Sequence, residues 1–179
     1  VNIIADENDL GAYLTSHADV AKVSFTGSVE TGRKIMKSGA ESLKRLTLEL
    51  GGNDAMIVLD DVNVSDVAPK IFDAAMLNCG QVCLAAKRIF VQGKIYDEMA
   101  AALGAIARDT VVDDGMKQGA RLGPLQNRMQ YEKVKGLIES AKREGGLPLV
   151  RARQIPSSAR IRRACRRCRP DRHSHRRIP

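Results

Sequence analysis

The sequence lacks any long uninterrupted run of apolar residues, although 44% of its 179 residues are hydrophobic. A helix that crosses a bilayer needs about 18 or more apolar residues in succession, so we expect no membrane-spanning helix. A secretory leader is also missing, and the sequence begins at Val1, inside an apolar segment. We therefore predict a soluble, cytoplasmic globular chain that is a piece of a longer protein.

Lysine is absent from residues 147–179, which carry 11 arginines and one acid, Asp171. Residues 1–146 hold 18 basic and 20 acidic residues, so the net charge of +8 arises from the tail. One interpretation is an arm that binds nucleic acid or acidic surfaces. The other is out-of-frame translation of GC-rich DNA after about Gly146. The shortage of large apolar residues and of any helical or strand period favours the second, so we expect an out-of-frame or disordered tail and no nucleic-acid partner.

The tail also contains a zinc-like arrangement of Cys165, Cys168, His173 and His175. Structural zinc sites use these residue types as tetrahedral ligands. No turn or core pattern surrounds the four residues, so we expect no metal site. Nothing else in the sequence indicates an oxidising compartment, and we expect no disulfide.

Strand-like and helix-like segments alternate along the chain, which predicts a parallel α/β sheet. The expected strands are 20–25, 45–50, 55–59 and 88–92, and the third reads as buried on both faces. The expected helices run from the caps Asn8, Ser28 and Ser65 to His17, Ser38 and Asn78, and two more follow. One of these has Ile95, Met99, Leu103 and Ile106 on one face. The last ends at Glu144, with an apolar stripe of Met129, Val134, Leu137, Ile138 and Ala141.

Cys83 is the first candidate catalytic residue, at the end of Asn78-Cys79-Gly80-Gln81-Val82-Cys83. A cysteine thiolate attacks electrophilic carbon. A turn after a buried helix can hold such a thiol at a cleft, where backbone N–H groups point at the attacked oxygen. An inert buried cysteine is the alternative. The Gly80-Gln81 pair and an upstream glutamate favour the catalytic interpretation.

That glutamate is Glu49, in Leu48-Glu49-Leu50-Gly51-Gly52, 34 positions before Cys83. We expect it at the end of an apolar strand, where partial burial would suit it to take a proton from water. An ordinary carboxylate at a strand end is the alternative. Covalent catalysis on a carbonyl explains both motifs together.

Phe25-Thr26-Gly27-Ser28 forms a strand-to-helix turn that leads toward Gly32. Backbone N–H groups at a helix N-terminus bind phosphate well. Such turns are common in α/β proteins, and this one lacks the full Gly-x-Gly-x-x-Gly fingerprint. Taken alone, it therefore leaves phosphate binding and a purely structural turn both open.

The three motifs, followed by Gly123-Pro124, resemble the aldehyde dehydrogenase superfamily in order and spacing over residues 1–146. The resemblance implies an α/β fold in which 1–51 end a Rossmann-type cofactor domain and 52–146 begin a catalytic domain, followed by the tail 147–179. It implies a fragment of an NAD- or NADP-dependent oxidoreductase that converts an aldehyde to a carboxylic acid through a cysteine thioester. The parent would form a homo-oligomer, a dimer or a tetramer.

The resemblance also assigns roles by motif. Cys83 matches the nucleophile and Glu49 the general base. The implied cofactor contacts are Phe25, Thr26, Gly27, Ser28, Leu50, Gly51, Gln130 and Lys133. The acids in Ala5-Asp6-Glu7-Asn8 depart from the family, which often has a glycine-bearing turn there, and would oppose a pyrophosphate.

Other parts of the family's site have no counterpart in this sequence. The asparagine that shares the oxyanion hole with the cysteine N–H precedes Val1 in the family, and further cofactor contacts should follow Gly146 but do not. We therefore expect little or no dehydrogenase activity from this chain alone. Relatives that form acyl-CoA or run reductively through the same thioester stay open as alternatives, as does an inactive fragment whose basic tail binds nucleic acid or acidic surfaces.

Overall fold

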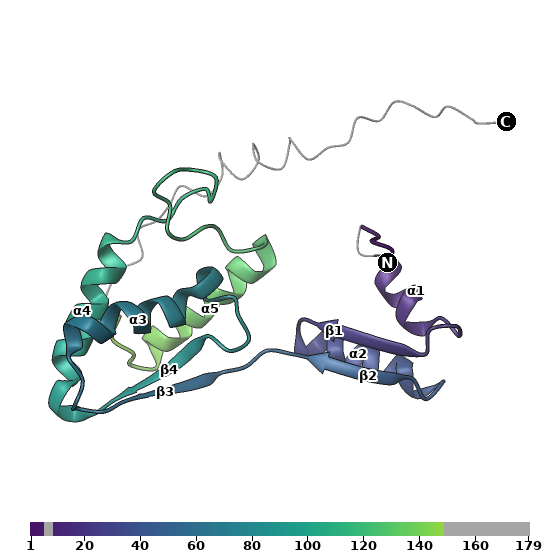
Figure 1. Cartoon of the computed structure of the whole chain (residues 1–179), viewed down its shortest axis with the longest axis horizontal. Coiled ribbons are helices and arrows are strands. Elements are labelled where there is room, and N and C mark those ends of the chain that lie inside the picture. Colours follow the sequence, from purple (N-terminus) through teal and green to yellow (C-terminus); the bar gives the residue numbers. More distant parts are fainter. Residues whose placement is uncertain (6–8, 149–179) are drawn as a thin grey trace.

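The computed structural model describes residues 1–5 and 9–148. Its elements form two groups, joined by the extended segment between β2 and β3 (Figure 1). The first group comprises α1 (Leu10–Ser16), β1 (Lys22–Thr26), α2 (Val29–Ala40) and β2 (Arg45–Glu49). The second comprises β3 (Asp54–Val58), α3 (Val64–Met76), β4 (Ala86–Val91), α4 (Tyr96–Asp109) and α5 (Arg128–Arg143).

Each group contains one pair of parallel strands, which confirms the α/β class. Strand β1 pairs with β2, and Thr26 lies opposite Glu49 at their carboxyl ends. Strand β3 pairs with β4 in the second group. In both groups a helix connects the paired strands, as a parallel connection requires.

The largest buried cluster lies in the second group, where α3 and α4 pack together beside β4. It consists of Val58, Val64, Ala68, Ile71, Ile95 and Met99. Met99 is fully buried, which confirms the apolar face predicted for its helix. Ile89 and Val91 of β4, the strand that follows the loop carrying Cys83, pack against this cluster.

Helix α3 begins two residues earlier than predicted from the sequence. Asn63, not Ser65, is the N-cap, and its Oδ1 accepts hydrogen bonds from the amides of Ser65 (2.9 Å) and Asp66 (3.3 Å). Both residue types cap well, and the asparagine comes first in the chain. The predicted cap Ser28 is confirmed, because its Oγ accepts from the Thr31 amide at 3.1 Å. The expected cap Asn8 lies outside the described residues.

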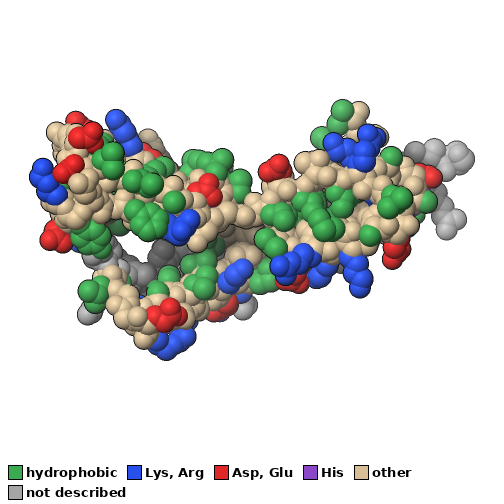
Figure 2. Space-filling model, turned by 90° about the horizontal axis from the view of Figure 1, so that it is seen from below, with side chains coloured by type: hydrophobic (Ala, Val, Ile, Leu, Met, Phe, Trp, Pro, Cys, Tyr) green, Lys and Arg blue, Asp and Glu red, His purple; other side chains and the backbone are tan. Residues whose placement is uncertain are grey.

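The burial predicted for β3 on both faces is wrong for the described residues. Strand β3 is covered on one face only, and Ile57 is 74% exposed. The apolar stripe of α5 is present, but no residue of that helix is buried, and Leu137 is 61% exposed. No element in the described residues covers the open face of β3 or the apolar stripe of α5. Hydrophobic side chains accordingly appear over much of the surface seen in Figure 2.

No helix in residues 1–5 and 9–148 combines the length and apolar content needed to span a bilayer. The predictions for residues 149–179, including the zinc-like cluster and the arginine-rich arm, lie outside the described residues.

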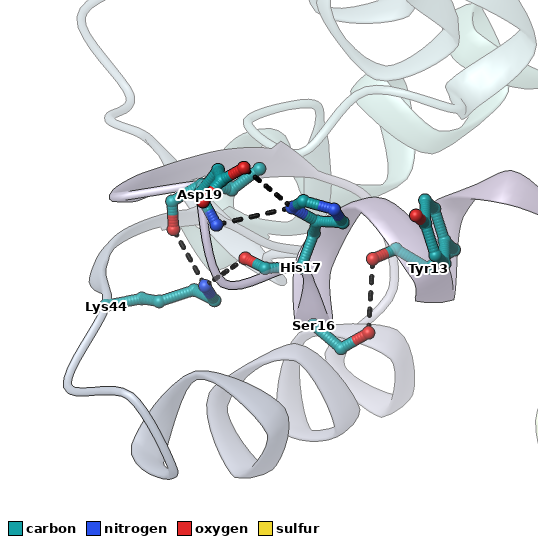
Figure 3. A network of polar contacts seen from close by, with 6 residues as sticks. Tyr13, Ser16, His17, Asp19 and Lys44 are labelled. Carbon is teal, nitrogen blue, oxygen red and sulfur yellow. Dashed lines mark hydrogen bonds and ion pairs between the residues drawn. The ribbon is translucent and has the colours of Figure 1, made fainter.

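Lys44 connects the elements of the first group through its buried ammonium group. Its Nζ donates to the carbonyl oxygens of His17 (2.6 Å) and Val20 (2.7 Å), in the segment between α1 and β1 (Figure 3). The His17 ring in turn packs edge-on against Tyr13. Only 9% of Lys44 is exposed, so these two carbonyls replace the water that the ammonium group loses on folding.

Replacing Met99 by Ala should lower the free energy of unfolding by about 2–5 kcal/mol, because a cavity opens in the main cluster. Urea unfolding monitored by circular dichroism measures the change. The matched control is Met116→Ala, at a residue 93% exposed, which should shift stability by less than about 0.5 kcal/mol. Equal effects of the two variants would contradict the assigned core.

Replacing Lys44 by Met should lower the free energy of unfolding by about 1–3 kcal/mol, because two carbonyl groups lose their donor. Hydrogen exchange at the first group should rise while that of the second group stays unchanged. Lys37→Met, on the exposed side of α2, is the control. Unchanged exchange around residues 17–22 would show that the Lys44 contacts do not hold this group together.

Candidate active site

The predicted cofactor turn lies at the carboxyl ends of β1 and β2. The Gly27 amide donates to the Glu49 carbonyl oxygen at 3.0 Å, which brings the first and second motifs together. The ring of Phe25 folds over Gly27, so closely that a Cβ on Gly27 would lie 2.5 Å from the ring. Leu50 packs against Gly32 of α2, where a Cβ would approach the Leu50 side chain to 2.8 Å. Thr26, by contrast, is exposed at the end of β1, and Gly51 has open space around it.

Helix α2 presents free backbone donors at this turn. Ser28 caps the Thr31 amide and accepts from the Gly32 amide, while the amides of Val29 and Glu30 have no partner among the described residues. Free amides and the positive end of a 12-residue helix suit a phosphate group. The Glu30 carboxylate would repel a phosphate, but Lys34 Nζ forms an ion pair with it at 3.0 Å. The arrangement fits one phosphate-bearing ligand.

Glu49 ends β2 with its side chain exposed, so the predicted partial burial is wrong for the described chain. The cause is the small sheet: β2 pairs with β1 and with no other strand in the described residues. Its carboxylate forms no ion pair or hydrogen bond within residues 1–5 and 9–148.

Cys83 follows a turn of unusual backbone conformation, and this confirms the predicted end of the helix near Asn78. Asn78 (φ 49°), Cys79 (φ 59°) and Gly80 (φ 74°) are all left-handed. For a non-glycine residue this conformation costs about 1–2 kcal/mol, and such strain is concentrated at functional sites. Gln81 stabilises the turn, because its amide and its Nε2 both donate to the Asn78 carbonyl oxygen at 3.1 Å. The turn leaves the Cys83 side chain exposed.

The glutamate and cysteine motifs meet at Gly52. A Cβ on Gly52 would lie 2.5 Å from the Cys83 carbonyl oxygen and 2.6 Å from Asp54 Oδ1. Only glycine allows the two backbones to approach so closely. Beside this contact, Arg88 Nε donates to the Asn53 carbonyl oxygen at 2.8 Å. The segment after Glu49 is thereby fixed against the segment that carries Cys83.

Sequence reasoning missed two parts of this arrangement. One is the close approach of Gly52 to the segment that carries Cys83. The other is Lys87, whose Nζ donates to the carbonyl oxygens of Val82 (2.6 Å) and Cys83 (3.2 Å). The only signal for Lys87 in the sequence is a single cation four residues after Cys83, which is weak because such residues are usually solvated.

The loop from Thr110 to Asn127, which joins α4 to α5, contacts the left-handed turn before Cys83. The Gly123 amide donates to Cys79 Sγ at 3.2 Å, and the thiol lies 3.3 Å from the Gly123 carbonyl oxygen. The Gln126 amide donates to Gln81 Oε1 at 3.0 Å. Both contacts join the left-handed turn to the residues that precede α5. A surface hollow of about 490 Å³ beside Cys79 is lined by this loop and the end of α3.

Gln130 and Lys133, the predicted contacts on α5, lie apart from the other candidates. The Gln130 amide donates to the cap residue Asn127 at 2.9 Å. In the described part of the chain, neither side chain forms a hydrogen bond or ion pair with Cys83, Glu49 or the Gly27 turn. The structure thus brings Cys83 near the glutamate motif and that motif near the Gly27 turn, and no polar contact joins Gln130 or Lys133 to them.

Replacing Gly52 by Ala should lower the free energy of unfolding by about 1–3 kcal/mol, because the new methyl group overlaps the Cys83 carbonyl oxygen. The matched control is Gly51→Ala, because no atom beyond its chain neighbours lies within 4 Å of a Cβ at that position. Its stability should change by less than about 0.5 kcal/mol. Urea denaturation compares the two. Equal stability of both variants would show that the motifs do not meet at Gly52.

Comparison with known proteins agrees with this arrangement. A family model described as the aldehyde dehydrogenase family matches residues 1–160. The chain is 47% identical over 146 residues to a "Probable aldehyde dehydrogenase" of a Pseudomonas species, a match covering 82% of this chain and 30% of that protein. It is 39% identical over 157 residues to the betaine aldehyde dehydrogenase of Sinorhizobium fredii, covering 88% and 32%.

Solved structures give the same result. The aldehyde dehydrogenase of Bartonella henselae superposes with a TM-score of 0.78 at 35% identity, covering 87% of this chain and 33% of that one. The NAD+ complex of an aldehyde dehydrogenase from Bacillus cereus gives 0.74 at 38% identity, covering 80% and 30%. The chain therefore spans about a third of the length of these relatives. Because the family match covers most of its residues, the chain belongs to the aldehyde dehydrogenase family.

Proposed function

We propose that this chain is the central part of an NAD- or NADP-dependent aldehyde dehydrogenase, in which Cys83 is the nucleophile and Glu49 the general base. The observation that carries the proposal is the close approach of Gly52 to the Cys83 carbonyl oxygen. Gly52 lies three residues after Glu49 in the sequence. An exposed thiol and an unpaired carboxylate are thus held on two adjoining backbone segments.

Cys83 acts first in the proposed reaction. Its thiolate attacks the aldehyde carbon, a C–S bond forms, and the carbonyl electron pair moves to oxygen to give a thiohemiacetal. When bound, the nicotinamide group supplies the acceptor for the hydride that this carbon must lose to become a thioester. The exposed position of Cys83, after a strained turn, leaves the sulfur accessible to such a substrate.

Glu49 acts second. Its carboxylate takes a proton from water, and the resulting hydroxide adds to the thioester carbon. The C–S bond then breaks, which releases the carboxylic acid and restores the Cys83 thiolate. The freedom of Glu49 from ion pairs within the described residues supports this role.

The cofactor would bind at the carboxyl ends of β1 and β2. The free amides of Val29 and Glu30, beside Ser28, suit the pyrophosphate, and Thr26 and Gly27 would lie along the nicotinamide side. Leu50 and Gly51 adjoin this turn, whereas Gln130 and Lys133 require α5 to approach it. Relatives include both an NAD+ complex and an enzyme described as NADP dependent, so both cofactors stay within the proposal.

A homo-oligomeric parent, the domain division at Gly51, and a cytoplasmic location stay predictions. So does the low activity of the chain alone, which spans about a third of its relatives. An acyl-CoA product is the rival outcome within the same thioester chemistry. Assays with and without coenzyme A distinguish it.

The nucleophile is tested by grafting residues 1–146 into the matching third of the Pseudomonas relative, which is 47% identical. In this chimaera, Cys83→Ala should lower aldehyde-dependent NAD(P) reduction by about 10⁴-fold or more, because no thioester forms. The control Cys79→Ser keeps a donor and acceptor for Gly123 and should retain activity within about 10-fold. Near-normal activity of the Cys83→Ala chimaera would refute the proposed function.

A further inference from the structure

Lys87 occupies an irregular position in the sheet that carries the nucleophile. Asp54 pairs with Ala86, but the next residue, Ala55, pairs with Arg88, so β4 contains one extra residue at Lys87. A bulge of this kind redirects a side chain and is frequent beside active sites. The redirected side chain reaches back to the turn that precedes its own strand.

The Lys87 ammonium group contacts backbone rather than acids. Its Nζ lies 2.6 Å from the Val82 carbonyl oxygen and 3.2 Å from the Cys83 carbonyl oxygen. In residues 1–5 and 9–148 it forms no ion pair, whereas Lys94 of the same group pairs with Asp60 at 3.5 Å. Its charge is therefore directed at the two peptide groups that flank the Cys83 α-carbon.

The Val82 carbonyl and the Cys83 N–H belong to one planar peptide group. In a trans peptide they point in opposite directions, so holding the carbonyl also fixes the direction of the N–H. A charged donor on the carbonyl polarises the whole group and strengthens the N–H as a donor. The Cys83 amide has no acceptor among the described residues, which leaves it available to a ligand.

We propose that Lys87 is a positioning residue for oxyanion stabilisation: it fixes and polarises the Val82–Cys83 peptide so that the Cys83 N–H donates to the oxygen of a carbonyl attacked by Cys83. The inference rests on the proposed role of Cys83 as the nucleophile. Through Lys87, the bulge in β4 would affect the chemistry at Cys83.

Two reactions of the same sulfur test this on the 179-residue chain, without cofactor. With p-nitrophenyl acetate, the Cys83 thiolate attacks the ester carbonyl, an S–C bond forms, the C–O bond breaks, and p-nitrophenolate leaves with the electron pair while the thiol proton passes to buffer. The intermediate carries an oxyanion. With iodoacetamide, sulfur displaces iodide at a saturated carbon and no oxyanion forms. Mass spectrometry with fragment ions assigns each product to Cys83.

Lys87→Met should slow acetylation of Cys83 by about 10-fold, less than the 10²–10³-fold loss on removing an oxyanion donor itself, and leave its alkylation rate unchanged. Lys87→Arg retains a charged donor and should recover most of the acetylation rate. Lys94→Met, which removes a cation paired elsewhere, should change neither rate. Circular dichroism checks that all three variants keep the fold.

Equal slowing of both reactions by Lys87→Met would overturn the proposal, because Lys87 would then act on the thiol or its access. Unchanged acetylation would overturn it as well, while Cys83 would stand as the nucleophile. Failure of the proposed function differs from both results: the unaltered chain would then acetylate Cys83 no faster than Cys83 in the same chain unfolded in urea.

Discussion

The parallel pairing of β3 with β4 is the constraint on which the site depends. The glutamate motif precedes β3 by one residue, and the cysteine motif precedes β4 by two residues. Pairing the two strands therefore brings the motifs together. The close approach of Gly52 to the Cys83 carbonyl oxygen is the direct result. The buried cluster around Met99 supports the pair from one side. This pairing sets the segment that follows Glu49 beside the segment that carries Cys83.

The turn between α3 and β4 is held under strain by contacts from several directions. Asn78 and Cys79 have left-handed backbones, a conformation that persists only where surrounding contacts fix it. Gln81, Gly123 and Lys87 provide those contacts, through the Asn78 carbonyl, the Cys79 sulfur and the carbonyls beside Cys83. The contacts place an exposed thiol next to an unpaired amide. The strained turn at Asn78 and Cys79 therefore leads directly to the exposed Cys83.

Many large hydrophobic side chains of the described residues are exposed, because the elements cover only part of one another's apolar faces. Strand β3 has a covered face and an open face, and α5 displays an apolar stripe without a partner. Glu49 is exposed for the same reason, since β2 pairs with a single neighbour. A family member that spans about a third of its relatives shows these features together.

The sequence by itself determined the alternation of strands and helices, the cap at Ser28, the helix face of Met99 and the family to which the chain belongs, because these depend on local pattern and residue chemistry. The burial predicted for both faces of β3 failed, because periodicity gives the apolar face of an element but not what covers it. Gly52 against Cys83 and the bulge at Lys87 depend on strand register between segments about 30 residues apart. Tertiary structure alone decided them, because register follows from packing and not from local sequence.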